Sequence, residues 1–175
     1  SQVWKYREDI RKMHKLQEQY LFLARHNIHS AEELVGTIAS LTDKKKETSA
    51  EKSRIYKARE RSRELFTAAD EMENLKPAEQ SYRLGDTFFE DEHRKWVALE
   101  QELQAQGYAL EEVQALRRHY KEEYSEVCAK EKVVFRELNT GKAILNSMIP
   151  DSISDGRKTE YNREIIRDRK EQPVR

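Results

Sequence analysis

Two histidines spaced three residues apart, His26 and His29, are the residues of this sequence best placed to bind a metal ion. Imidazole nitrogens are frequent zinc ligands, and a spacing of three brings two side chains to one face of a helix. The helical pattern breaks between them, however, at Asn27, and the sequence indicates no third ligand. His93 and His119 each stand alone on a charged segment. We therefore interpret the histidines as capping or surface residues, and predict no metal site and no cofactor.

Eight tyrosines could supply a nucleophile, at positions 6, 20, 56, 82, 108, 120, 124 and 161. Activation of a tyrosine hydroxyl requires a neighbouring base or a metal ion, and the sequence signals neither. Adjacent acids such as Glu32-Glu33 and Glu122-Glu123 point apart on a helix instead of converging. Cys128 is the single cysteine, which excludes an intrachain disulfide and a cysteine zinc cluster. Since there is also no glycine-rich phosphate loop and no Ser-His-Asp arrangement, we predict that this chain has no catalytic residues and is not an enzyme.

The clearest charge anomaly is a basic run that begins at Lys44 and ends at Arg63. It carries nine basic residues against three acids, a net charge of +6, whereas residues 64–92 carry nine acids against two basic residues, a net charge of −7. A basic helix face can bind nucleic-acid phosphates without reading the sequence, with an affinity that falls as salt rises. The alternative is a solvated face whose charges pair with later acids such as Glu122, Glu123 and Glu126. The candidate DNA contacts are Lys44, Lys45, Lys46, Lys52, Arg54, Lys57, Arg59, Arg61 and Arg63.

The composition favours long helices over a compact globular core. Charged residues make up 38% of the 175-residue chain and apolar residues 37%, and 33 basic residues balance 33 acidic ones. Ordinary soluble domains contain roughly 25% charged and about 45–50% apolar residues. Helix seams need only about two apolar residues in seven, so the composition fits an ordered, elongated, all-α protein. Disorder, the rival interpretation, usually goes with a high net charge, which this chain lacks.

An N-terminal helix is predicted within residues 1–29, from about Val3 to His26. Its apolar stripe consists of Trp4, Ile10 or Met13, Leu16, Tyr20 and Leu23. The next helix has a strong start signal, because Ser30 and Glu33 can form a capping box in which each caps the backbone of the other. Ile28 and Leu34 are spaced for the accompanying hydrophobic staple.

Residues 30–149 are predicted to form an antiparallel coiled-coil hairpin of two long helices, from helices at about 31–75, 87–106 and 110–149. Pro77 is expected to end the first of these or to restart it. Asp86 or Thr87 is predicted to cap the middle helix, with Glu90 completing a capping box on Thr87, and Gly107 to stop it. The middle helix should bury Phe89, Trp96, Leu99 and Leu103. The predicted seam between the long helices contains Leu34, Ile38, Leu41, Phe66, Leu116, Val127, Val134, Leu138 and Leu145.

Two further features indicate a compartment and an origin. A lone thiol is typical of a reducing cytoplasm, and the longest uncharged stretch, Leu34 to Thr42, is far shorter than a membrane span. We therefore predict a cytoplasmic protein that does not enter a membrane. The chain begins at Ser1 instead of Met, so we expect it to be a fragment of a larger protein. Residues 150–175 are predicted to be a charged, frayed tail.

Several segments together resemble a helical region of relaxases, the mobilisation nucleases of conjugative elements, particularly those of Gram-positive bacteria. The resemblance covers about residues 4–149 in order and spacing. The segments are Met13-His14-Lys15-Leu16, then Tyr20-Leu21-x-Leu23, then Asn27-Ile28-His29-Ser30-Ala31-Glu32-Glu33-Leu34, then Val113-x-x-Leu116-x-x-x-Tyr120, and then Lys130-Glu131-Lys132.

The resemblance implies a place in a larger protein and not a catalytic role. Relaxases cleave DNA with a three-histidine metal site and a tyrosine, and no matching His-x-His cluster exists here. What the resemblance implies is the helical C-terminal region of such a mobilisation protein, concerned with DNA contact, with assembly of the nicking complex, or with docking to the conjugation machinery. The alternative is a free-standing coiled-coil scaffold for protein–protein interaction without a DNA role. Self-association is compatible with both.

Overall fold

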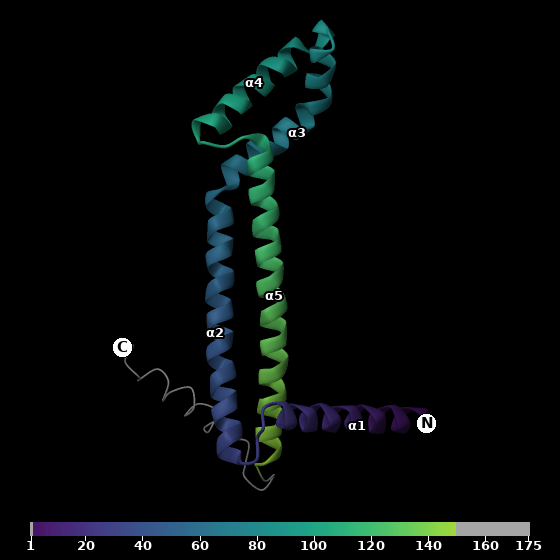
Figure 1. The fold of residues 1–175 in the computed structure, drawn as a ribbon. Helices are drawn as coiled ribbons and strands as arrows, with labels where there is room; N and C mark the ends of the chain where they lie inside the picture. Colours follow the sequence, from purple (N-terminus) through teal and green to yellow (C-terminus); the bar gives the residue numbers. More distant parts are fainter. Residues whose placement is uncertain (1, 150–175) are drawn as a thin grey trace, which may run out of the picture. The chain divides into compact units, whose positions relative to one another are not determined.

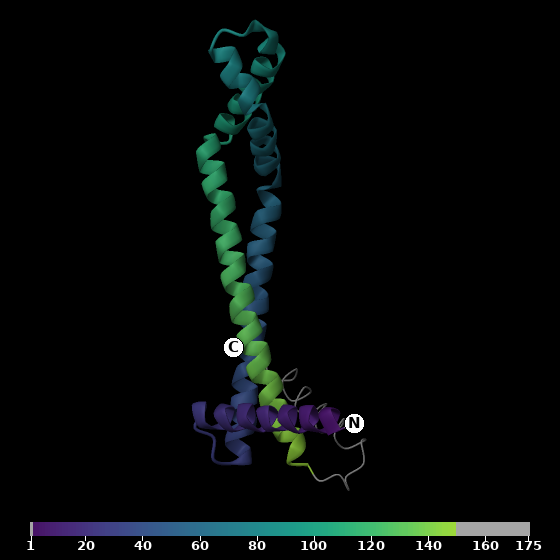
Figure 2. The same cartoon turned by 90° about the vertical axis from the view of Figure 1, so that its right-hand side faces the viewer.

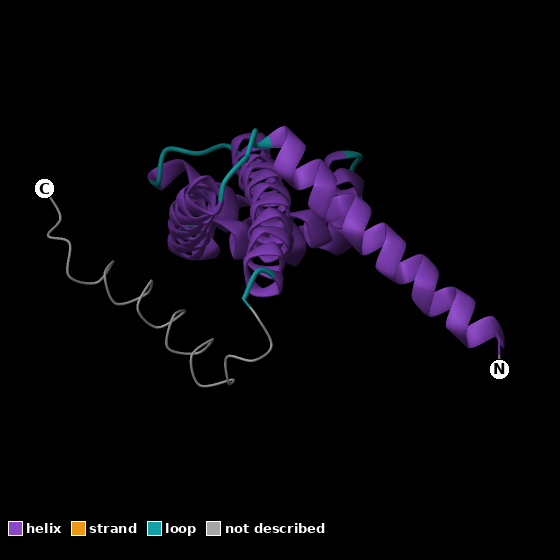
Figure 3. Cartoon of the chain, turned by 90° about the horizontal axis from the view of Figure 1, so that it is seen from below, coloured by secondary structure: helices purple, strands orange, loops and turns teal. Residues whose placement is uncertain are grey.

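In a computed structural model that describes residues 2–149, every regular element is a helix, and the predicted all-α class is confirmed (Figures 1 and 3). The predicted tail, residues 150–175, lies outside the described residues. The elements in chain order are α1 (Gln2–Arg25), α2 (Ala31–Arg61), α3 (Arg63–Arg83), the short 3-10 helix η1 (Thr87–Phe89), α4 (Glu90–Ala105) and α5 (Leu110–Ser147).

The chain divides into two compact units, which are described one at a time. Unit 1 consists of residues 1–46 and 132–175, of which 2–46 and 132–149 are described. Unit 2 consists of residues 47–131. Both α2 and α5 contribute to each unit, so the division runs across the predicted hairpin of residues 30–149 and not between its helices.

The core of unit 1 forms where the end of α1, the start of α2 and the end of α5 meet (Figure 1). Phe22 is its largest fully buried side chain, at 0% exposure. Gly141 of α5 permits the close approach, because a Cβ at this position would lie 3.0 Å from Cζ of Phe22 and 3.1 Å from Cγ1 of Ile38. The buried cluster is Phe22, Ile28, Leu34, Ile38, Leu41, Leu138, Ile144 and Leu145.

The turn between α1 and α2 has most of the predicted capping chemistry. Oγ of Ser30 accepts a hydrogen bond from the backbone N–H of Glu33 at 3.2 Å, and Ile28 and Leu34 are both buried in the unit 1 core. The Glu33 carboxylate was predicted to accept from the backbone N–H of Ser30. It accepts instead from the backbone N–H of His29, at 2.7 Å. Asn27 takes a φ of 51°, a left-handed conformation that asparagine tolerates better than most residues.

The apolar stripe of α1 does not pack against other described residues, apart from its last member. Leu23 packs against the unit 1 core, whereas Trp4, Ile10, Met13 and Tyr20 are each at least half exposed. Leu16 is exposed as well, so the stripe faces solvent along most of the helix.

Unit 2 has its core between α3, α4 and the start of α5. Figure 2 shows α3 and α4, drawn in teal, folded against each other, and the loop between them carries η1. Gly107 ends α4 with a φ of 84°, the left-handed conformation predicted for this stop. Of the predicted face of α4, Trp96 and Leu103 are buried and Phe89 and Leu99 half-buried. The buried cluster is Leu65, Ala68, Ala69, Met72, Trp96, Leu103 and Val113.

The predicted single helix over residues 31–75 is interrupted at Ser62, which separates α2 from α3. The Ser62 hydroxyl donates to the Ala58 carbonyl at 3.2 Å, a back-bond that competes with the helical hydrogen bonds and often bends a helix. One turn later, Arg117 of α5 donates to the Phe66 carbonyl at 2.7 Å and pairs with Asp70 at 2.7 Å. Figure 1 shows that α3 runs at an angle to the adjoining part of α2.

Two further predictions at the α3–α4 end are wrong. Pro77 neither ends nor restarts a helix but lies inside α3, where the neighbouring turns are held by buried Met72 and Glu79. The predicted capping box of Thr87 and Glu90 does not form, because Thr87 belongs to η1 and α4 begins at Glu90 without a side-chain cap. Asp86 caps η1 instead, and its carboxylate accepts from the backbone N–H of Phe88 at 3.1 Å.

Side chains of α2 and α5 contact each other within each unit. Leu41 and Leu138 belong to one buried cluster in unit 1, and Lys52 pairs with Glu131 in unit 2. Of the nine predicted seam residues, six are buried and the other three, Phe66, Leu116 and Val134, are half-buried. Among residues 2–149, no helix combines the length and the apolar character that crossing a membrane requires.

Candidate functional site

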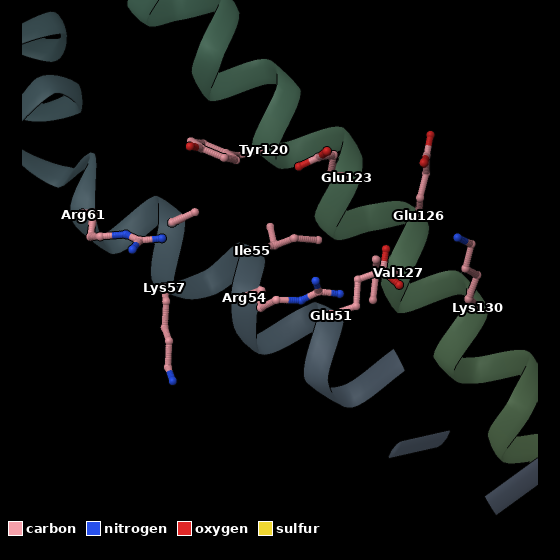
Figure 4. Close-up of a pocket in the computed structure, with 11 residues that line it drawn as sticks. Glu51, Arg54, Ile55, Lys57, Arg61, Tyr120, Glu123, Glu126, Val127 and Lys130 are labelled. Carbon is pink, nitrogen blue, oxygen red and sulfur yellow. The ribbon is translucent and has the colours of Figure 1, made fainter. Parts of the chain in front are cut away.

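In unit 2, a groove of about 660 Å³ runs between residues 51–61 of α2 and residues 120–130 of α5. Ile55 and Val127, which are 9% and 2% exposed, line it from opposite helices (Figure 4). The remaining lining residues are polar or charged except Ala58, and comprise Glu51, Arg54, Lys57, Arg61, Tyr120, Glu123, Glu126 and Lys130. The groove therefore has a narrow apolar floor and charged walls.

The two walls of this groove differ in charge. The α2 wall carries one acid, Glu51, and three cations, Arg54, Lys57 and Arg61, whose steps of three and four residues place them on one side of the helix. The α5 wall carries the carboxylates Glu123 and Glu126 and one cation, Lys130. An anion entering the groove would approach these acids as well as the cations.

Arg54, Lys57 and Arg61 form what we call the α2 basic edge. All three side chains are exposed. In the described part of the chain, no ion pair or hydrogen bond engages any of them. In Figure 4 the Lys57 side chain extends away from α5. Seven residues of helix separate Arg54 from Arg61, a rise of about 10 Å, so the three charges lie close enough to act together on one polyanion.

Lys52, another candidate DNA contact, is engaged within unit 2. Its Nζ donates to Glu131 at 3.0 Å and lies 5.8 Å from the centre of the Tyr124 ring. The hydrogen bond to Glu131 and the charge of that carboxylate raise the pKa of Lys52 above its usual value. This ion pair is of the kind that the alternative interpretation of the basic run expected, although its acid is Glu131 and not Glu122, Glu123 or Glu126.

The remaining candidates have varied surroundings. Lys45 is half-buried, with its Nζ 5.2 Å from the centre of the Phe135 ring in unit 1. Arg63 is the first residue of α3 and lies 3.8 Å from Glu60. Lys44, Lys46 and Arg59 are exposed. The structure thus places Lys45 and Lys52 against side chains of α5 and Arg63 beside an acid, whereas the side chains of the other candidates are exposed.

Four of the five histidines, all except His14, contact nearby polar groups within the described part of the chain. His26 and Arg25 both bond to Glu137, with 2.7 Å between Nε2 of His26 and Oε2 of Glu137, whereas His29 lies 2.8 Å from Oδ1 of Asn27. The two members of the His26-x-x-His29 pair therefore have different partners. Across residues 2–149, no group of three or more His, Cys, Asp or Glu side chains is arranged to hold a metal ion.

A buried carboxylate in unit 2 was missed by the sequence interpretation. Glu79 of α3 is only 3% exposed, and it accepts from Nε of Arg83 at 2.6 Å and lies 2.7 Å from Nδ1 of His93. Tyr82 stacks on the His93 ring at 4.1 Å. Burial alone would raise the pKa of Glu79, but the hydrogen bonds and charges of His93 and Arg83 outweigh it and lower the pKa. The four-residue spacing of Glu79 and Arg83 was visible in the sequence, but the contact with His93 on another helix was not.

The tyrosines are distributed between packing and exposed positions. Tyr108 packs against the unit 2 core, and Tyr120 contacts Phe66 edge-on at 6.4 Å. Tyr6, Tyr20 and Tyr56 are exposed, and Tyr161 lies outside the described residues. Cys128 is a half-buried free thiol.

Comparison with known proteins adds no relative: no family model, no curated protein and no solved structure matches this chain.

Proposed function

We propose that this chain is a non-catalytic helical module that contacts the DNA backbone through the α2 basic edge. The observation that carries the proposal is that Arg54, Lys57 and Arg61 share one face of α2, are exposed, and have no partner within residues 2–149. Helix faces of this kind bind phosphates by charge and read little sequence, because they offer few groups that recognise base edges.

The resemblance of the sequence to relaxases gives this activity a context. We propose that the chain serves as an accessory region of a conjugative relaxase, supporting DNA contact or assembly of the nicking and transfer complex on a mobile genetic element. The chemistry of strand cleavage would then belong to a nuclease domain elsewhere. The histidines support this division, since His26, His93 and His119 each lie beside a glutamate and not beside one another.

The DNA proposal predicts a specific salt dependence. If the three cations of the α2 basic edge each neutralise one phosphate, they should contribute about −2.7 to the slope of a plot of log affinity against log salt concentration. Replacing Arg54, Lys57 and Arg61 together with Gln should flatten the slope by that amount, with duplexes of unrelated sequence bound equally. Fluorescence anisotropy across a salt series measures both quantities.

The matched control removes three cations from another helix, by replacing Arg11, Lys12 and Lys15 of α1 with Gln. This variant has the same net charge as the first variant, and its salt dependence should have the same slope as that of the wild-type chain. Equal weakening by both variants would mean that net charge, and not the α2 basic edge, attracts DNA. Strand cleavage by the chain with divalent metal would contradict its non-catalytic assignment.

The second candidate function is a coiled-coil scaffold without a DNA role. It is favoured by the meeting of α2 and α5 side chains in both units, through Leu41 and Leu138 in one and Lys52 and Glu131 in the other. Absence of DNA binding at low salt by the wild-type chain would select this alternative.

Both candidate functions include the proposal that α2 and α5 pair as one antiparallel coiled coil. An elongated hairpin should have a radius of gyration well above the roughly 16 Å of a compact chain of this length. Small-angle scattering of the dilute chain measures this value, extrapolated to zero concentration so that association does not contribute. A value near that of a compact chain would contradict the pairing.

A further inference from the structure

A set of exposed residues on α1 follows a seven-residue repeat and shares Ile10, Met13 and Tyr20 with the apolar stripe described above; in this subsection the stripe means this repeat. With the repeat positions lettered a to g and Val3 placed at a, the residues at a and d are all exposed. Three successive repeats of this kind are characteristic of a helix that pairs with another helix. The a residues are Val3, Ile10, Gln17 and Ala24, and the d residues are Tyr6, Met13 and Tyr20.

The packing of α1 directs this stripe away from its own unit. Phe22, at position f on the opposite side of the helix, is the α1 side chain that is fully buried in the unit 1 core. Ile10, Met13 and Tyr20 are 51%, 69% and 71% exposed. Figures 1 and 3 show that, within unit 1, only the C-terminal end of α1 lies beside α2 and α5. The a and d residues are therefore available to another molecule.

The residue types at these positions favour a second copy of this chain as that molecule. β-Branched residues at a, here Val3 and Ile10, occur in parallel two-stranded coiled coils, where the usual d residue is Leu; in α1 the d positions carry Tyr and Met. A single Asn or Lys at an a position is known to specify the register, because it pairs best with its own counterpart in the other helix, and we assign the same role to the side-chain amide of Gln17. These are features of a two-stranded coiled coil whose helices run in the same direction.

The flanking positions complement each other in the same arrangement. In a parallel pair, each g residue faces the next e residue of the other helix. Asp9 at g would then face His14 of the second copy, and Leu16 would face Leu21. An antiparallel pair that aligns Ile10 with Met13 would instead bring two basic groups, Arg7 and His14, together. Of these two arrangements, the parallel one places an acid beside an imidazole and leucine beside leucine, whereas the antiparallel one places two basic groups together.

We propose that α1 mediates dimerisation of this chain through a parallel, in-register, two-stranded coiled coil along its Val3–Ala24 stripe. Dimerisation would present two copies of the α2 basic edge together, but it does not depend on DNA contact. The inference rests on α1 alone, so it stands or falls separately from the proposed function.

The first test is the oligomeric state of the full chain and of two matched variants by analytical ultracentrifugation. The wild-type chain should dimerise in the micromolar range, and Ile10→Gln/Met13→Gln should raise the dimer dissociation constant at least about a hundredfold. The control Arg11→Gln/Lys15→Gln alters the other side of α1 and should leave the constant within about twofold. Circular dichroism should show that both variants fold. A wild-type chain that stays monomeric at millimolar concentration, or a dimer insensitive to the stripe variant, overturns the proposal.

The second test determines the direction of the two helices. In a Cys128→Ser background, Val3→Cys should form an interchain disulfide rapidly, because equivalent a residues of a parallel pair lie within disulfide distance. In the antiparallel pair the two cysteines would lie about 25 Å apart. The control Lys15→Cys, at position f, should not crosslink. Equal crosslinking of both variants, or no crosslinking of Val3→Cys, overturns the parallel arrangement. Stripe-dependent binding of a monomer to phosphatidylcholine–phosphatidylglycerol vesicles would assign the stripe to a lipid surface and also overturn the proposal.

Discussion

Replacing Leu138 with Asp should unfold unit 1 or leave it severely destabilised. Leu138 is 2% exposed in a cluster that joins residues of α1, α2 and α5. A carboxylate at this position would lose its hydration without gaining a partner, which costs several kcal/mol, and the lost leucine contacts add about 2–5 kcal/mol more. Since small proteins are stable by only about 5–15 kcal/mol, the expected loss is a large fraction of the total.

The matched control for this prediction is Val133→Asp. Val133 lies five residues earlier on the same helix, in the same unit, and is 59% exposed. The Val133→Asp substitution should change the free energy of unfolding by less than about 1 kcal/mol. Urea denaturation followed by circular dichroism measures both variants, and amide hydrogen exchange identifies the unit that loses protection. Similar stabilities for the two variants would show that burial at Leu138 has little energetic weight.

The parts of the fold that the sequence predicted best are those with local causes. The start of α2 depends on Ser30, Glu33 and the pair Ile28 and Leu34, all within seven residues, and it forms with one change of hydrogen-bond partner. Gly107 stops α4 because its φ is positive, which is a property of the residue itself. Signals of this kind need no knowledge of the rest of the chain.

The errors arise where packing overrides a local signal. Pro77 remains inside α3 because Met72 and Glu79 on either side are buried in unit 2. The break at Ser62 coincides with contacts from Arg117, which lies more than fifty residues later in the sequence. Neither position has a neighbour in the sequence that reveals the outcome, so a periodicity analysis cannot place them.

In the candidate site, too, the sequence predicted the local pattern but not the contacts that depend on packing. Sequence counting located the basic run, but its charge density could not separate Lys52, which pairs with Glu131, from Arg54 and Lys57, which are exposed. That separation depends on which face of α2 packs against α5. The stripe of α1 was equally visible as a pattern, yet only the structure shows that Ile10 and Met13 are exposed and not part of a core.

Replacing Glu79 with Gln should destabilise unit 2 in a pH-dependent manner. At neutral pH the carboxylate bonds to Arg83 and His93 while only 3% exposed, and the amide can replace it only in part. Hydrogen bonds to a charged group contribute about 1.5–3 kcal/mol each, and both partners can recover some hydration, so the expected loss is about 1–3 kcal/mol in total.

The pH dependence follows from the direction of the pKa shift. The pKa of Glu79 is lowered in the folded state from its ordinary value of 4.5, so its ionised form stabilises the fold above that pH. This contribution is lost as the pH falls through the folded-state pKa, where the carboxyl takes up a proton and becomes similar to the amide. The stability difference between wild type and Glu79→Gln should therefore be greatest near neutral pH and shrink in acid.

Urea titrations at a series of pH values measure this difference, with Glu90→Gln as the control, since Glu90 forms an exposed pair with Arg94. A difference that stays constant into acid would mean that the shape of the side chain, and not its charge, stabilises this end of α3.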